Sequence, residues 1–141
     1  MSRKDTYEDY YHLLKHEQEG RDFRVLSLLR GADVAVIAPH GGGIEPGTSE
    51  IARAVAGDVH PLYLFEGIKQ RGNLDLHITS ERFNEPRAKQ LVEKSQKALA
   101  IHGEGSSSAT VFIGGRDCEW ANLIDAALTD AGFETAEHKS P

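Results

Sequence analysis

An apolar run that leads straight into a glycine-rich segment constrains the fold of this chain more than any other feature. The run Val34–Ala38 is followed by the segment Pro39–Glu45, which holds three consecutive glycines, and then by Gly47–Glu50. A short continuous apolar run bounded by turn residues is typical of a buried strand, and a serine after glycines favours the start of a helix. The segment therefore predicts a buried strand over 34–38, a turn, and a helix that begins near Ser49.

Patterns of the same kind alternate along the rest of the chain. They predict strands over 22–29, 61–65, 74–78, 98–101, 110–113 and 133–136, and helices over 5–19, 49–56, 86–96 and 118–131. Strands that alternate with helices indicate a layered α/β fold with a mixed, mostly parallel sheet. Trp120 lies on the apolar stripe of the last helix and is predicted to be a core residue. A length of 141 residues suits one domain, so we expect residues 1–141 to form a single domain.

The composition argues against some classes of binding partner. The formal net charge is −6, from 16 basic and 22 acidic residues, which argues against a general nucleic-acid footprint. Cys118 has no second cysteine in this sequence to pair with, which favours a reducing compartment. No apolar run is long enough to span a membrane, and the polar start of the sequence does not resemble a secretory signal. We therefore expect a cytoplasmic protein with no nucleic-acid and no membrane partner.

Two of the apolar runs end in the same dipeptide, His-Gly. His40 follows the run 34–38 and His102 follows the run 98–101, so two parallel strands would bring both rings to one edge of the sheet. Glu45 lies on a loop flexible enough to join them. Two histidines and one glutamate with an open position are the usual composition of a catalytic zinc site, where the pKa of the bound water falls to about 7. Two alternatives stay open: loop histidines bonded to the backbone, and His77 as the third ligand.

Other motifs carry weaker signals. The spacing from Gly42 to Thr48 is that of a phosphate-binding loop, but the lysine is missing and Glu45 would repel a phosphate. Cys118 opens a predicted helix without a histidine partner in an obvious motif, which disfavours a nucleophilic role. The remaining histidines are predicted to be surface or structural residues: His12, His16, His60 and His138.

Four motifs, in one order, resemble those of the phage poly-γ-glutamate hydrolases. They are the segment 38–50, the pair 76–80 and 82–86, the segment 100–103, and Gly114-Gly115. That family is zinc-dependent and cleaves γ-glutamyl amide bonds in the capsule polymer of bacilli. The resemblance implies one zinc ion and a three-layer α/β/α sandwich similar to that of the zinc carboxypeptidases.

The resemblance also implies roles for single residues. His40 and Glu45 would be zinc ligands. His102 would be the third, because carboxypeptidase-like and aspartoacylase-like enzymes use a histidine that ends an apolar strand. A segment of these relatives that supplies a substrate-binding arginine is loosely matched around residues 75–83, which makes His77 and Arg82 candidates for substrate contact.

The resemblance further implies a segment beyond this sequence that brings a glutamate as general acid and base. Nothing after Gly132 matches such a segment, so either the chain is a shortened homologue or the catalytic base lies elsewhere. Glu104 is a candidate substitute because it lies two residues past His102, and the alternative is a solvated loop acid. The function expected is zinc-dependent hydrolysis of poly-γ-glutamate or a glutamyl peptide, with release by host lysis. The alternatives are a zinc- or anion-binding homologue without turnover, and a related amidase that acts on cell-wall or N-acyl amino-acid amides.

Overall fold

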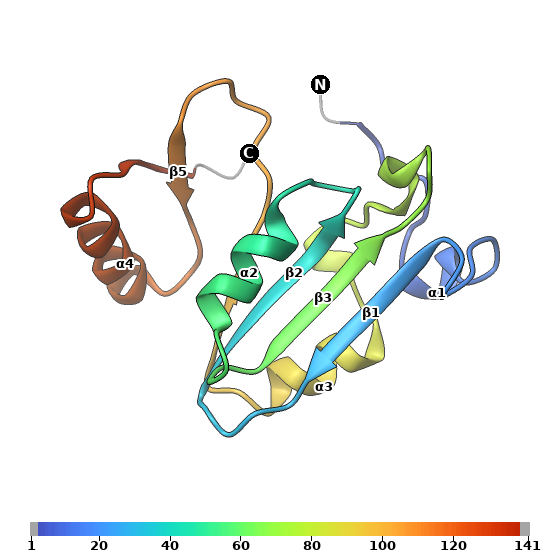
Figure 1. The fold of residues 1–141 in the computed structure, drawn as a ribbon, viewed down its shortest axis with the longest axis horizontal. Coiled ribbons are helices and arrows are strands. Elements are labelled where there is room, and N and C mark those ends of the chain that lie inside the picture. The colour runs from blue at the N-terminus through green and yellow to red at the C-terminus, as the bar shows by residue number, and fades with distance from the viewer. Residues whose placement is uncertain (1–2, 139–141) are drawn as a thin grey trace. The chain divides into compact units, whose positions relative to one another are not determined.

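A mixed sheet of four strands organises the first part of the chain (Figure 1). The computed structural model describes residues 3–138, and the chain divides into two units, Met1–Gly103 and Glu104–Pro141. In the first unit the strand order is β1-β3-β2-β4, with β1 antiparallel to β3 and β2 parallel to both β3 and β4. The strands are β1 (Phe23–Leu28), β2 (Val34–Gly42), β3 (Leu62–Gly67) and β4 (Lys97–Ala100). The predicted mixed α/β fold is therefore confirmed.

Helices cover both faces of this sheet. Helix α2 (Thr48–Ala56) packs against one face, while α3 (Pro86–Glu93) and the short α1 (Tyr10–Leu13) contribute to the core on the other. Successive side chains of a strand point to opposite faces. Accordingly, Ala35 of β2 belongs to the core beneath α1 and α3, whereas Val36 belongs to the core beneath α2. The first unit thus has the helix–sheet–helix layers that were predicted.

Strand β2 continues four residues beyond the predicted end at 38. Its register with β3 shifts between Ala38 and Gly41, after which Gly41 pairs with Glu66 and Gly42 with Gly67. Gly42 has a φ of 60°, and a Cβ at this position would lie 2.5 Å from the carbonyl oxygen of Gly67. Only glycine tolerates this backbone and this approach. His40 is therefore held within the strand and not on a free loop.

The predicted helix over 5–19 is wrong, because only Tyr10–Leu13 is helical. Asp9 has an extended backbone, and its side chain accepts a hydrogen bond from the backbone N–H of His12 at 2.8 Å. Such an N-cap starts a helix at the next residue and stops it from extending backwards. Tyr7 and Tyr10, whose spacing of three residues suggests a helix, both belong to the core, so their spacing reflects burial instead.

The predicted strand over 74–78 is also wrong. Asn73–Leu76 form a 3₁₀ helix, η1, and a second one, η2, spans Ser80–Arg82. The backbone N–H of His77 donates to the carbonyl of Leu74 at 3.2 Å, which is a turn contact and not a sheet contact. Leu76 and Ile78 are buried without belonging to a strand, whereas Leu74 is exposed. Helix α3 ends at Glu93, three residues earlier than predicted.

The second unit is a parallel pair of strands joined by a helix. Strands β5 (Thr110–Ile113) and β6 (Glu134–Glu137) flank α4 (Cys118–Asp130), as the sequence predicted within one residue at most ends. Asp117 caps α4 by accepting from the backbone N–H of Trp120 at 3.0 Å. Trp120 is only half-buried, and no residue of α4 is fully buried, so its predicted place in a core is wrong. No helix within residues 3–138 is both long and apolar enough to cross a bilayer.

Candidate metal centre

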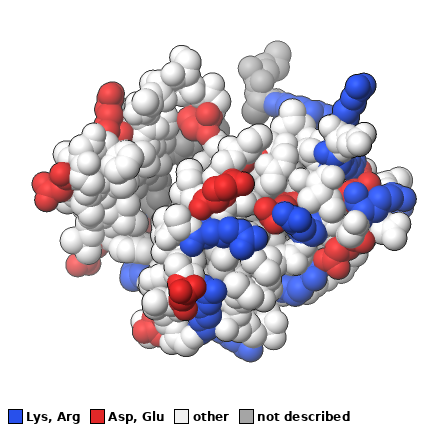
Figure 2. All heavy atoms as spheres, viewed as in Figure 1, with Lys and Arg blue, Asp and Glu red and all other residues white. Residues whose placement is uncertain are grey.

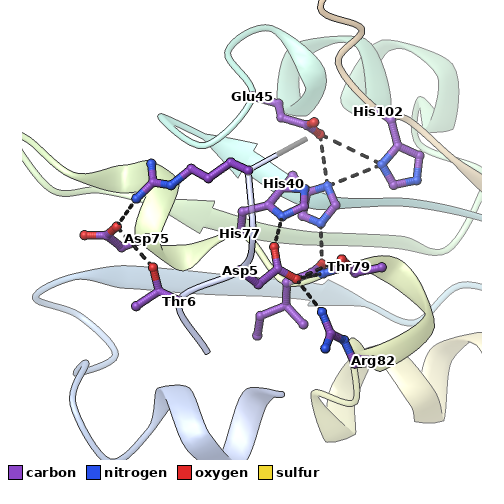
Figure 3. A network of polar contacts seen from close by, with 11 residues as sticks. Asp5, Thr6, His40, Glu45, Asp75, His77, Thr79, Arg82 and His102 are labelled. Atoms are coloured by element: carbon purple, nitrogen blue, oxygen red, sulfur yellow. Dashed lines mark hydrogen bonds and ion pairs between the residues drawn. The ribbon is translucent and has the colours of Figure 1, made fainter. Parts of the chain in front are cut away.

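His40 is buried at the carboxyl end of β2 with one ring nitrogen already engaged. Its Nε2 lies 2.7 Å from the carbonyl oxygen of Ile78. A carbonyl only accepts hydrogen bonds, so Nε2 carries the proton and donates, and Nδ1 of the neutral ring keeps its lone pair. The ring is therefore fixed with Nδ1 directed at Glu45, whose Oε1 lies 3.0 Å away (Figure 3).

Glu45 returns to His40 from the turn that follows β2. The backbone N–H of Glu45 donates to the carbonyl of His40 at 2.9 Å, and the Thr48 hydroxyl at the start of α2 donates to the Glu45 carbonyl at 2.9 Å. Burial alone would raise the pKa of the Glu45 carboxyl, but the His102 and His40 rings and the N–H of Gly103 lower that pKa below its ordinary value. The carboxylate is consequently ionised and held in place.

His102 completes a group of three nitrogen and oxygen atoms. Its Nδ1 lies 3.3 Å from His40 Nδ1 and 3.9 Å from Glu45 Oε1. The residue follows β4, the neighbour of β2 in the sheet, which explains why the two rings meet as the parallel strands predicted. Exposure rises across the group, from a buried His40 to a His102 side chain that is 39% exposed, so the centre opens on the His102 side.

This donor set fits a divalent metal ion such as zinc. The Nδ1 lone pair of a neutral His40 and the Glu45 carboxylate are both acceptors, and acceptors 3.0 Å apart repel each other unless a proton or a metal ion lies between them. Zinc bonds of about 2.0–2.2 Å in tetrahedral geometry place neighbouring ligand atoms roughly 3.3–3.5 Å apart. The observed separations of 3.0, 3.3 and 3.9 Å bracket that range.

His77 lies against the same centre from a different segment. Its ring stacks on His40 with centroids 4.0 Å apart and an interplanar angle of 27°. One atom each of His40, Glu45 and His77 lie within 4.8 Å of one another, so this trio is a second possible ligand set. The His77 Nδ1, however, is 2.7 Å from Asp5 Oδ1, which leaves Nε2 as the ring nitrogen available to the centre.

Arg82 is turned toward an acidic residue that the sequence did not single out. Its Nη2 lies 3.2 Å from Asp5 Oδ2, although half of the Arg82 side chain remains exposed. Asp5 also bonds His77, so both predicted substrate-contact residues converge on one carboxylate (Figure 3). More than 70 residues separate Asp5 from its partners, and neither periodicity nor spacing signals such a contact. Glu104 is exposed and begins the second unit, and its catalytic role stays a prediction.

An open cavity of about 380 Å³ lies beside the centre in the first unit. It is bounded by the end of β2, by β4 and by α3, and His102 forms part of its wall. Most of the remaining lining is apolar, including Phe83 and Val92, while Lys89 supplies a cationic group and Glu93 an anionic one. The cavity therefore offers space for an aliphatic chain next to the candidate ligand His102, with charged groups for its polar ends.

Charge is mixed on the face of the first unit in Figure 2. Acidic and basic side chains are interspersed there. Ion pairs within the first unit join Arg24 to Glu66 at 2.9 Å and Lys69 to Glu17 at 2.7 Å. A surface of this kind produces no strong field of one sign.

A sequence model described as poly-gamma-glutamate hydrolase matches residues 7–141 of the chain. The chain belongs to the poly-γ-glutamate hydrolase family. Solved structures agree with this assignment of family and fold. A zinc-free structure of YndL matches 97% of this chain and 67% of that one, with a TM-score of 0.91 and 36% identity. A bacteriophage poly-gamma-glutamate hydrolase structure matches the same shares, with a TM-score of 0.92 and 31% identity.

Two relatives of this chain in Bacillus subtilis (strain 168) are about twice as long. The SPbeta prophage-derived UPF0714 protein YoqZ is 42% identical over 129 residues, which are 92% of this chain and 46% of YoqZ. The UPF0714 protein YndL is 38% identical over 130 residues, which are 92% of this chain and 51% of YndL. This poly-γ-glutamate hydrolase family member thus spans about half the length of these relatives.

Proposed function

We propose that this chain hydrolyses γ-glutamyl amide bonds of poly-γ-glutamate, with one zinc ion held by His40, Glu45 and His102. The observation that carries the proposal is the convergence of two imidazole nitrogens and an ionised carboxylate in a member of this hydrolase family. We favour His102 over His77 as third ligand because it follows β4, the strand next to β2, and its Nδ1 lies 3.3 Å from His40 Nδ1. When bound, zinc supplies a Lewis acid and a water of lowered pKa.

The protein's own groups prepare the centre for this chemistry. The carbonyl of Ile78 fixes the His40 tautomer, so that Nδ1 is the nitrogen presented. Gly103 donates its N–H to Glu45 Oε1 at 3.2 Å, which holds the carboxylate against His102. Ligands whose own positions are fixed need little reorganisation on metal binding, and this favours tight and selective coordination.

The surroundings suit a chain of glutamyl units. Each unit of poly-γ-glutamate carries a short aliphatic segment and a free carboxylate, and the cavity beside His102 combines apolar walls with the Lys89 ammonium group. We assign Lys89 and Arg82 to the binding of substrate carboxylates, and His77 to contact with the scissile amide. Glu104 remains the proposed general base, which would take the proton of the attacking water.

The proposal is tested by the length of the polymer. Purified chain with one equivalent of zinc is incubated with poly-γ-glutamate, and the product is sized by gel filtration. We expect shortening by the wild type and none by His40→Ala, while His16→Ala, a matched change at an exposed ring, behaves as the wild type. Intact polymer with the wild type would overturn the proposal.

The second candidate is zinc binding without turnover. It is favoured by the chain's span of about half the length of YoqZ and YndL. The same experiment separates the two, because this candidate predicts one zinc per chain, lost in His40→Ala, together with uncut polymer. Competition by glutamate oligomers separates a polyglutamate hydrolase from an amidase for cell-wall or N-acyl amino-acid substrates, since only the former is blocked.

A further inference from the structure

Asp5 is a buried carboxylate at the centre of a small hydrogen-bond network. Its side chain is 5% exposed. Its Oδ1 accepts from His77 Nδ1 at 2.7 Å, and its Oδ2 accepts from the Thr79 N–H at 2.6 Å and the Thr79 hydroxyl at 2.8 Å. Arg82 Nη2 adds a fourth contact at 3.2 Å (Figure 3). The carboxylate therefore joins the amino-terminal segment to three residues of the turn beside the metal centre.

The two oxygens of this carboxylate have different partners. Oδ2 receives three donors, while Oδ1 receives only the His77 ring. A buried carboxylate is costly unless donors satisfy it, and an ionised carboxylate is an acceptor only. Because Asp5 accepts, the nitrogen facing it must donate, and His77 therefore carries its proton on Nδ1.

This tautomer determines what His77 presents to the centre. In the neutral tautomer with Nδ1–H bonded to Asp5, Nε2 is the unprotonated ring nitrogen, and no residue within 3–138 forms a hydrogen bond to it. The ring cannot turn freely, because it stacks on His40 with centroids 4.0 Å apart. One His77 nitrogen lies within 4.8 Å of the His40 and Glu45 ligand atoms, so the ring lies close enough to reach a substrate bound there.

We propose that Asp5 is a positioning residue, which holds His77 so that Nε2 accepts a hydrogen bond from the amide N–H of the bound substrate. This inference rests on the proposed function, because the amide is that of a γ-glutamyl bond. The role goes beyond anchoring the amino-terminal segment. The positioning role requires a hydrogen-bond acceptor at Oδ1. A neutral donor of the same size there would reverse the direction of the hydrogen bond with His77 Nδ1.

The chain supplies a matched control at Asp75. Its carboxylate also anchors the amino-terminal segment, through Arg3 and through the Thr6 hydroxyl at 3.3 Å. It has no contact with His77 among the interactions of residues 3–138. Asp75→Asn therefore weakens the anchoring alone, whereas Asp5→Asn changes both the anchoring and the partner of His77.

The substitution Asp5→Asn makes a specific prediction for the His77 ring. The three donors at the Oδ2 position keep the asparagine oxygen there, so its NH₂ group faces His77 Nδ1. Nδ1 must then accept, and the ring proton moves to Nε2. In zinc-loaded protein with ¹⁵N-labelled histidine, we expect NMR to show His77 protonated at Nδ1 in the wild type and Asp75→Asn, and at Nε2 in Asp5→Asn.

Kinetics and metal affinity complete the test. We expect Asp5→Asn to lower kcat on poly-γ-glutamate by about tenfold or more, with KM and zinc affinity within about twofold of the wild type. Asp5→Asn and His77→Ala together should lower kcat no more than His77→Ala alone, since Asp5 acts through His77. Asp75→Asn should leave all three quantities unchanged.

Several results would overturn the inference. A wild-type His77 protonated at Nε2 would do so without any variant, even if Asp5→Asn did not fold. An unchanged kcat in Asp5→Asn would leave only an anchoring role, and a large loss of zinc affinity would make His77 a ligand. If the wild type cut no polymer, the proposed function would fail and with it the substrate contact. The tautomers would still show whether Asp5 sets the His77 ring.

Discussion

Replacing His102 with alanine is expected to remove most of the zinc-dependent stabilisation of this protein, whereas replacing His77 is expected to preserve it. These two histidines are the alternative candidates for the third zinc ligand. His102 Nδ1 is 3.3 Å from His40 Nδ1, while His77 Nδ1 is held by Asp5 at 2.7 Å. The two side chains are similarly exposed, at 39% and 32%, so the substitutions form a matched pair.

The magnitude follows from mass action. Zinc at about one hundred times its Kd stabilises the folded state by about 2.7 kcal/mol. For a chain of this length that corresponds to a rise in Tm of about 10 °C. If loss of one of three ligands weakens binding about a hundredfold, the same zinc concentration yields only about 0.4 kcal/mol, or roughly 1–2 °C.

The assay is thermal unfolding of the metal-free protein, with and without zinc, for the wild type and both variants. We expect the zinc-induced rise in Tm to persist in His77→Ala and nearly to vanish in His102→Ala. The metal-free Tm should barely change in His102→Ala, because this side chain is substantially exposed. The opposite pattern, with the rise kept in His102→Ala and lost in His77→Ala, would refute the reasoning and move the third ligand to His77.

Three further predictions concern the scaffold. Gly42→Ala should destabilise the protein by about 1–3 kcal/mol in urea unfolding, because φ is 60° and a Cβ would lie 2.5 Å from the Gly67 carbonyl oxygen; an unchanged midpoint would contradict this. Leu13→Ala should cost about 2–5 kcal/mol by the same measurement, since the side chain is fully buried. Burial would raise the pKa of Glu66, but hydrogen bonds such as that from Arg24 lower the pKa overall. The ionised Glu66 therefore contributes to stability at pH values above the ordinary carboxyl pKa. Glu66→Gln should therefore destabilise by about 1 kcal/mol at pH 7 and progressively less as the pH falls below about 4, and a pH-independent difference would argue against the pairing.

The sequence predicted those parts of the molecule whose signals are local. The run Val34–Ala38 and the glycines after it identify β2 and the turn, because burial and backbone conformation there depend on neighbouring residues. His40 and His102 were expected to meet because both follow parallel strands, and their ring nitrogens lie 3.3 Å apart. The metal ligands themselves remain a proposal that zinc titration decides.

Contacts between distant segments were the part that sequence reasoning missed. Tyr7, Tyr10, Tyr11 and Leu14 have helical spacing, but the Asp9 cap leaves a mostly irregular segment in which only the two tyrosines Tyr7 and Tyr10 of this set are buried. The apolar residues around His77 resemble a strand, yet the turn is held by backbone bonds and by Asp5, more than 70 residues away. Propensity and periodicity describe one segment at a time and contain no information about such partners.

The long reach of the amino-terminal segment has a consequence for synthesis on the ribosome. Residues 3–10 leave the exit tunnel before the residues they bind, from Asp75 to Asn84, which are made about 70 residues later. Domains fold as units during translation, so this segment must wait without its partners while the β-sheet is being made. The nascent chain therefore completes the network around Asp5 late, and translation pauses between these two stretches prolong the time for which its tyrosines are exposed to chaperones.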